Sequence, residues 1–159
     1  MASLVNLRAE TPADQEFLLA LYSSTRAEEM KLVPWTDAQK QAFLRMQFDL
    51  QSAHYHSHYP DASYQVVVSG GDPIGRLYIH RTEDQILVID IALLPENRRA
   101  GIGGRLLAEI LAEADGARKK VAIHVERQNP ALGLYTRLGF QMVEDKGVYL
   151  YMERNPSGN

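Results

Sequence analysis

The spacing of apolar residues in the N-terminal half of the chain predicts two helices. One apolar stripe begins at Phe17, behind a Thr11-Pro12 pair that is typical of a helix start. A second start at Thr36 has a glutamine three residues later, as in a capping box, and opens a long helix. We expect a short strand over Leu4–Leu7 before the first helix. The long helix carries the apolar residues Phe43, Met46, Phe48 and Leu50.

The next segment changes from helical to extended spacing. Residues 64–68, 74–80 and 86–93 are runs of β-branched and aromatic side chains. Turn-forming residues at 70–73 and charged or polar residues at 81–84 separate them. These features predict an antiparallel meander of three strands.

The C-terminal part alternates between helix and strand. An apolar stripe that begins at Ile102 predicts a helix that packs one face on the sheet, with Gly116 as its C-terminal stop. A strand follows over Lys120–Glu126.

A short helix and a hairpin complete the chain. Asn129 and Pro130 read as a helix cap and first helical residue, and Gly139 ends that helix. Residues 141–154 predict two strands that turn near Lys146. The resulting order, β-α-α-β-β-β-α-β-α-β-β, is that of an α/β protein with a mixed sheet. A length of 159 residues suits one domain over 1–159.

Glycines cluster between the third meander strand and the following helix. Gly101, Gly103 and Gly104 let a ligand approach the backbone closely, because they lack a Cβ. The first N–H groups of a helix have no intrahelical partner and lie at the positive end of its dipole, so the turn predicts a phosphate site. Three arginines add positive charge around it: Arg98, Arg99 and Arg105.

Two common nucleotide motifs do not fit this turn. A P-loop requires Gly-Lys-Ser/Thr, which is missing here. The dinucleotide fingerprint requires a third glycine where the chain has Leu106.

The glycine segment resembles the acetyl-CoA pyrophosphate loop of the GCN5-related N-acetyltransferase (GNAT) superfamily, through Arg98-x-x-Gly101-x-Gly103. A second segment, from Asn129 to Tyr135 and on to Gly139-Phe140, is similar to the other signature of that superfamily. The resemblance implies a GNAT-like acyl-CoA N-acyltransferase fold and an enzyme that uses acetyl-CoA.

Composition narrows the partners and the chemistry. A net charge of −3 argues against nucleic acid as the main partner. No apolar run is long enough to span a bilayer, and no signal peptide is expected, so we expect a cytoplasmic protein without a membrane partner. The absence of cysteine removes a thiol nucleophile, so direct attack in a ternary complex is expected. A homodimer is one option for its assembly.

The resemblance also implies roles for particular residues in holding the cofactor. Backbone groups of the strand before the loop would meet the pantetheine arm, those of the loop the pyrophosphate, and Asn129 would lie near the cofactor arm. Leu93 is also a candidate for the oxyanion donor. The residues implied are Ile91, Ala92, Leu93, Arg98, Arg99, Ala100, Gly101, Ile102, Gly103, Gly104 and Asn129.

Acyl transfer to an amine also needs an acid for the departing thiolate and a base for the amine. Tyr135 matches the position where the family places the acid, and the alternative is a packing role. His124 takes a position where some relatives have a carboxylate, and its reference pKa near 6.5 suits a base. His124 could equally be structural. Asp90 is the other candidate base, although a structural role is favoured for it. Glu126 could be only a solvated strand end.

The segment between the first strand and the meander would line the acceptor side. Its histidines suggest a metal, but no carboxylate or cysteine accompanies His54 and His58 at metal-site spacing, so no metal is expected. Several side chains could contact an acceptor, although a place in the core is favoured for most of them: Trp35, Gln47, His54, Tyr55 and Tyr59.

The leading hypothesis is acetyl transfer from acetyl-CoA to the primary amine of a small molecule or amino-acid derivative. The alternative is a non-catalytic acyl-CoA-binding sensor or regulatory module. Transfer of a longer acyl chain is a third option.

Overall fold

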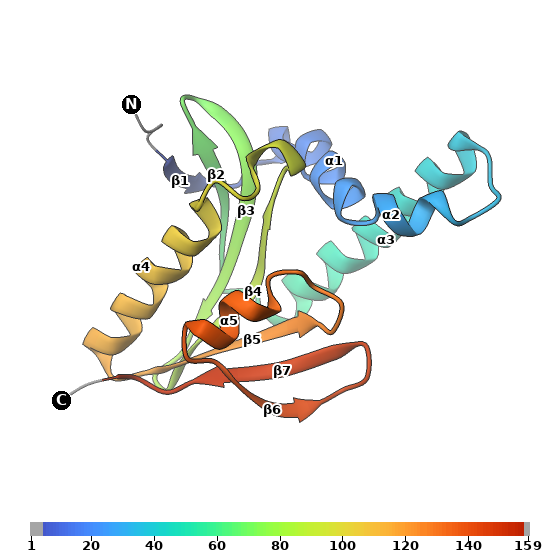
Figure 1. The fold of residues 1–159 in the computed structure, drawn as a ribbon. Coiled ribbons are helices and arrows are strands. Elements are labelled where there is room, and N and C mark those ends of the chain that lie inside the picture. Colours follow the sequence, from blue (N-terminus) through green and yellow to red (C-terminus); the bar gives the residue numbers. More distant parts are fainter. Residues whose placement is uncertain (1–4, 158–159) are drawn as a thin grey trace. The chain divides into compact units, whose positions relative to one another are not determined.

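A computed structural model describes residues 5–157 of the chain (Figure 1). Seven strands form one sheet in the order β1-β2-β3-β4-β5-β7-β6. The elements are β1 (Val5–Ala9), the 3-10 helix η1 (Pro12–Asp14), α1 (Gln15–Thr25), α2 (Ala27–Lys31), α3 (Asp37–His58), β2 (Ser63–Ser69), β3 (Asp72–Arg81), β4 (Gln85–Leu93), the 3-10 helix η2 (Pro95–Asn97), α4 (Ile102–Ala117), β5 (Lys120–Glu126), α5 (Leu132–Arg137), β6 (Gln141–Asp145) and β7 (Tyr149–Arg154). The mixed α/β order expected from the sequence is confirmed, with α2 and two 3-10 turns added.

The described residues fall into two compact units. Unit 1 comprises residues 5–77 and 92–98, and unit 2 comprises residues 78–91 and 99–157. Strands β3 and β4 each contribute residues to both units. The expectation of one domain over the whole chain stays a prediction.

In unit 1, α1 packs against α3 through an apolar cluster. Leu18 and Tyr22 of α1 meet Leu44 and Phe48 of α3, and the Tyr22 and Phe48 rings lie 5.9 Å apart. The capping box that begins α3 is present, because the Thr36 hydroxyl accepts a hydrogen bond from the Gln39 N–H (3.1 Å) and the Gln39 side chain accepts one from the Thr36 N–H (2.9 Å). These bonds satisfy two donors that the helix start would otherwise leave unpaired.

The start of unit 1 is fixed by β1 and a buried carboxylate. β1 pairs antiparallel with β2, and Leu4 lies outside the described residues. Asp14 accepts two hydrogen bonds from the Arg8 guanidinium (2.8 and 2.9 Å) and one from the Thr11 N–H (2.8 Å). These bonds lower the pKa of Asp14 to about 2. The helix start read from Thr11 is therefore confirmed, as a 3-10 turn that leads into α1.

In unit 2, β5 lies between β4 and β7. It pairs in parallel with β4 and antiparallel with β7, and β6 forms the outer strand beside β7 (Figure 1). Alternate residues of β5 point to opposite faces, so Val121, Ile123 and Val125 are buried whereas His124 is exposed. α4 buries one stripe, as expected: Leu106, Leu107, Ile110, Leu111 and Ala114.

Two helix boundaries differ from the sequence predictions. α4 does not stop at Gly116; it runs to Ala117, and Arg118 takes the left-handed conformation (φ 58°) that ends it. α5 begins at Leu132 with Ala131 in the cap position, so Asn129 and Pro130 precede the helix instead of opening it.

The apolar residues of α3 are only partly in the core. Phe48 is buried, but Met46 and Leu50 are 48% and 60% exposed, because the buried stripe of the helix runs through Leu44 and Phe48. None of the helices in residues 5–157 is both long and apolar enough to cross a membrane.

Candidate active site

Within residues 5–157, no side chain caps the first amides of α4. Arg99 and Gly101 both take left-handed backbone conformations, with φ 64° and 81°. Gly101 is the N-cap residue, so no side chain caps the helix, and the first turn contains no acidic residue. The uncapped N–H groups and the helix dipole therefore favour an anion at this end of α4.

Packing against residues 5–157 does not require glycine at positions 101 and 104. A Cβ added to Gly101 or Gly104 would meet no atom within 4 Å. Gly104 lies inside α4, where glycine costs about 1 kcal/mol relative to alanine. Open space beside the loop, gained at this cost, fits the close approach of a ligand to the backbone.

The strand that leads to the loop is held closely in unit 1. A Cβ on Gly75 of β3 would press on the Ala92 carbonyl and come within 2.7 Å of the Leu93 side chain. Leu94 N–H donates to Ile74 O (2.8 Å). Glycine is thus required at position 75 by the approach of β3 to the end of β4.

Arg98 contacts the same strand end. Its Nε donates a hydrogen bond to the Leu93 carbonyl (3.0 Å). The structure therefore brings Arg98 and Leu93, two predicted cofactor residues, together, and the Leu93 carbonyl already accepts a hydrogen bond from the arginine. Ile91 and Ala92 complete the strand on either side of the boundary between the units.

Tyr135 lies in α5 as a buried phenol. Its side chain is 5% exposed, and its ring packs edge-on against Phe140 (5.8 Å between centroids). Burial, and then the negative charge of Asp90, raise the pKa of Tyr135 to about 12. The phenol is therefore protonated at neutral pH and able to donate a proton.

Asn129 prepares the start of the helix that carries Tyr135. Its side-chain oxygen accepts a hydrogen bond from the Ala131 N–H (2.8 Å), and its carbonyl accepts one from Leu132 (3.1 Å). The Tyr135 N–H then donates to the Ala131 carbonyl (3.1 Å). The Asn129 side chain thus stabilises the turn that leads into α5, two residues before the cap residue Ala131.

His124 belongs to a different group of side chains. Its ring lies 4.9 Å from that of Tyr151 on β7, and its Nε2 is 3.3 Å from the Lys146 ammonium. Desolvation, and then the charge of Lys146, lower the pKa of His124. The structure therefore associates Asp90 with Tyr135, and His124 with Lys146 and Tyr151.

Sequence reasoning missed Lys146 and Tyr151 as neighbours of His124. Tyr151 is the cross-strand partner of His124 in the register of β5 with β7. Side-chain alternation alone could not predict this pairing, because β5 and β7 are separated along the chain by α5 and β6, and their register depends on tertiary packing.

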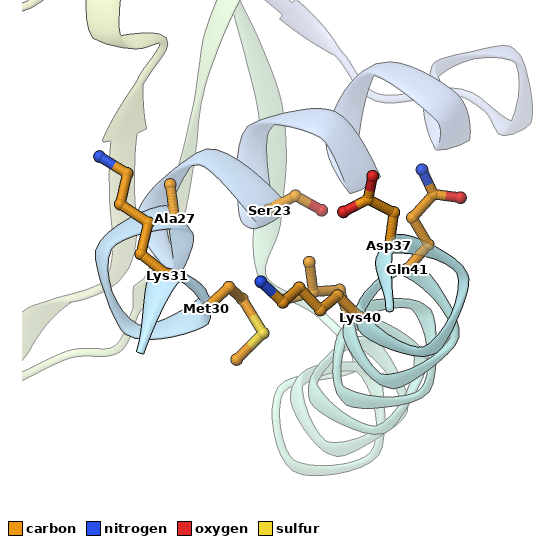
Figure 2. Close-up of a pocket in the computed structure, with 8 residues that line it drawn as sticks. Ser23, Ala27, Met30, Lys31, Asp37, Lys40 and Gln41 are labelled. Carbon is orange, nitrogen blue, oxygen red and sulfur yellow. The ribbon is translucent and has the colours of Figure 1, made fainter. Parts of the chain in front are cut away.

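Unit 1 has a surface depression between α1, α2 and α3 (Figure 2), with a volume of about 300 Å³. Ala27, Met30 and Leu44 give it apolar walls, whereas Lys31 and Lys40 bring positive charge to it. Ser23, Asp37 and Gln41 complete the lining. Figure 2 shows Ser23 reaching the depression from α1, whereas the other labelled side chains come from α2 and α3. The arrangement could contact a small polar molecule.

The aromatic candidates of unit 1 have mixed environments. Trp35 is 41% exposed and packs edge-on against Phe43, so it is not one of the candidates that lie in the core. The carbonyls of Tyr55 and Tyr59 accept hydrogen bonds from the Tyr64 hydroxyl (3.0 and 2.8 Å). Both are partly buried and serve the end of α3, and Gln47 is likewise partly buried.

The histidines of α3 do not form a metal site. The exposed His54 and His58 rings lie 4.0 Å apart, and His56 stacks on Tyr64 at 4.2 Å. Over the part of the chain that the structure describes, no group of three or more potential ligands could hold a metal ion.

Comparison with known proteins decides the family. Residues 60–142 match the acetyltransferase (GNAT) domain, a stretch that contains the glycine loop, His124 and Tyr135. The chain belongs to the GNAT acetyltransferase family. This confirms the resemblance read from the two motifs, and it identifies the chain as an acetyltransferase.

Solved structures share the fold of this GNAT protein. The PaiA N-acetyltransferase of Thermoplasma acidophilum, in complex with coenzyme A, is 19% identical with a TM-score of 0.69, over 96% of this chain and 99% of that chain. An acetyltransferase of Thermus thermophilus is 22% identical (TM-score 0.66; 95% and 96% covered). A GNAT acetyltransferase of Elizabethkingia anophelis with acetyl-CoA bound is 14% identical (TM-score 0.58; 95% and 97% covered). No curated protein sequence matches the chain.

Proposed function

We propose that this GNAT protein transfers an acetyl group from acetyl-CoA to the primary amine of a small molecule or amino-acid derivative. The observation that carries the proposal is the uncapped N-terminus of α4, with left-handed Gly101 before it and open space at Gly101 and Gly104. A diphosphate fits this set of donors, because it accepts hydrogen bonds from several N–H groups at once.

The loop and the preceding strand would hold the cofactor. The N–H groups from Arg99 to Gly104 bind the pyrophosphate, and the Arg99 side chain adds positive charge. Backbone groups of Ile91, Ala92 and Leu93 meet the pantetheine amides, with Arg98 bracing the carbonyl of Leu93. Asn129 shapes the turn beside the cofactor arm.

Acetyl-CoA supplies a thioester whose carbonyl carbon is open to attack. The acceptor nitrogen forms the new C–N bond there, and the C–S bond breaks. Tyr135 donates its phenolic proton to the sulfur. This is favourable because coenzyme A then leaves as a neutral thiol, which is a better leaving group than the thiolate. The sequence contains no cysteine that could carry the acetyl group, so the amine attacks directly in a ternary complex.

The amine must lose a proton to attack. His124 is the preferred base, because its lowered pKa keeps the ring unprotonated and able to accept a proton near neutral pH. Asp90 is the other candidate, although its charge already acts on Tyr135.

One experiment separates this function from a regulatory acyl-CoA-binding module. Coenzyme A binding is measured by calorimetry, and free thiol is followed with acetyl-CoA and a panel of amines, amino acids and peptide N-termini. We expect binding together with thiol release for one class of small amine. Binding without release for any amine would refute the enzyme and favour the module. The cytoplasmic location and a homodimer remain predictions, the latter checked by light scattering.

A further inference from the structure

The turn between β6 and β7 carries a lysine back onto β5. The Lys146 ammonium lies 3.3 Å from His124 Nε2 and 5.4 Å from the centroid of the Tyr151 ring. It also forms a loose ion pair with the Glu144 carboxylate, at 4.0 Å, between exposed side chains. The lysine therefore lies closer to the imidazole than to the Glu144 carboxylate, and it also stands over the aromatic ring.

The turn that carries Lys146 is braced on both sides. The Arg127 guanidinium forms an ion pair with Asp145 and donates from Nε to the Gly147 carbonyl (3.1 Å). The Asp145 carboxylate accepts the Gly147 N–H (2.9 Å), and Gly147 takes the left-handed conformation (φ 87°) that the turn requires. These contacts hold the backbone of Lys146 so that its side chain returns to His124.

The contact assigns the proton on the imidazole. An ammonium has only donors, so Nε2 of His124 must accept and cannot itself carry hydrogen; the neutral ring is then protonated at Nδ1. We propose that Lys146 is a positioning residue that keeps His124 unprotonated, with the Nε2 lone pair held ready on this face of β5. The inference rests on the proposed function, in which His124 is the base.

The charges around His124 agree with this role. Desolvation lowers the pKa of His124 most, the charge of Lys146 lowers it further, and the charge of Glu144 raises it. On the same face of the sheet, the next cross-strand pair is Glu126 with Tyr149. Among the neighbours of His124, Lys146 is thus the cation that lowers its pKa.

Lys146 does not have to prevent the substrate amine from reaching His124. Its side chain is 43% exposed, and the Tyr151 ring offers the ammonium a second place by cation–π attraction. An incoming amine can replace the ammonium at Nε2 while the positive charge stays close to the ring. The proton of the substrate amine then passes to Nε2, and His124 becomes an imidazolium.

The test is an NMR titration of the His124 ring, assigned by comparison with His124→Gln, in wild type and in Lys146→Met. We expect its midpoint to rise by about half a pH unit in Lys146→Met, as for loss of one partly exposed charge. Lys119→Met is the matched control: it removes the same charge from a lysine bound to the Thr82 carbonyl, and should leave the midpoint unchanged. Lys146→Arg keeps the positive charge, so its midpoint should stay close to that of wild type.

The acid limb of the pH dependence of kcat/KM is measured on the same proteins. A limb that shifts with the NMR midpoint supports both the inference and the base. An unchanged NMR midpoint in Lys146→Met overturns the inference, whatever the activity. A shifted midpoint with an unmoved limb leaves the coupling of Lys146 to His124 in place and overturns His124 as the base of the proposed function.

Discussion

Replacing Gly101 by valine should greatly weaken coenzyme A binding while leaving a folded chain. Gly101 has φ 81°, a conformation that costs a non-glycine residue about 1–2 kcal/mol. No atom lies within 4 Å of the added Cβ, so the Cβ itself meets no steric overlap in the free protein. The side chain instead fills the space beside the first amides of α4, where the diphosphate is proposed to bind.

The size of the binding loss follows from the hydrogen bonds at stake. A hydrogen bond to a charged group contributes about 1.5–3 kcal/mol, so losing one weakens coenzyme A binding about 10- to 100-fold. Calorimetry measures this loss directly, and thermal unfolding measures the cost to the fold.

Gly71→Val is the matched control for this experiment. Gly71 has φ 89° in the turn between β2 and β3, and its added Cβ also meets nothing within 4 Å. Both variants should lose similar stability, and only Gly101→Val should lose affinity. Wild-type affinity in Gly101→Val, or an equal loss in Gly71→Val, would refute the placement of the diphosphate.

Three further predictions follow from the structure. Tyr135→Phe should slow thiol release about 100-fold with unchanged coenzyme A affinity, because only the proton donor is lost; undiminished release would exclude the phenol as the acid. Gly75→Ala should lower the free energy of unfolding by about 1–3 kcal/mol in denaturant titration, because its Cβ presses on the Ala92 carbonyl; wild-type stability would disprove that close approach. Asp14→Asn should cost about 1–2 kcal/mol at pH 7 through loss of the Arg8 pair. The pKa of Asp14 is lowered to about 2, so its contribution is present above pH 4 and is lost as the pH falls toward 2; a stability difference independent of pH would contradict the assignment.

The elements that the sequence predicts well are those fixed by local chemistry. The Thr36 capping box is present, and β5 spans Lys120–Glu126 as expected. The glycine loop likewise precedes a helix that begins at Ile102. In each case the signal lies within a few residues, where backbone conformation and hydrogen bonding depend on neighbours in sequence.

The predictions that failed depended on more distant contacts. Gly116 read as a helix stop, yet α4 continues past it, because burial of Ala114 and the Asp115–Arg154 ion pair (2.7 Å) hold its last turn. The sequence favours a core position for most of the acceptor-side candidates, yet His54 is exposed because the stripe of α3 that packs against α1 runs through Leu44 and Phe48. Trp35, which precedes α3, is also exposed.

The amino-acid order alone determined the family, the order of elements and the place of the glycine loop before α4, because glycine and helix-start chemistry act over a few residues. Tertiary structure decided which side chains surround each candidate group. It placed the charge of Asp90 near Tyr135, and it brought Lys146 to His124. Such neighbours come from strand register and turn geometry, which many packing contacts set together and which no short stretch of chain encodes.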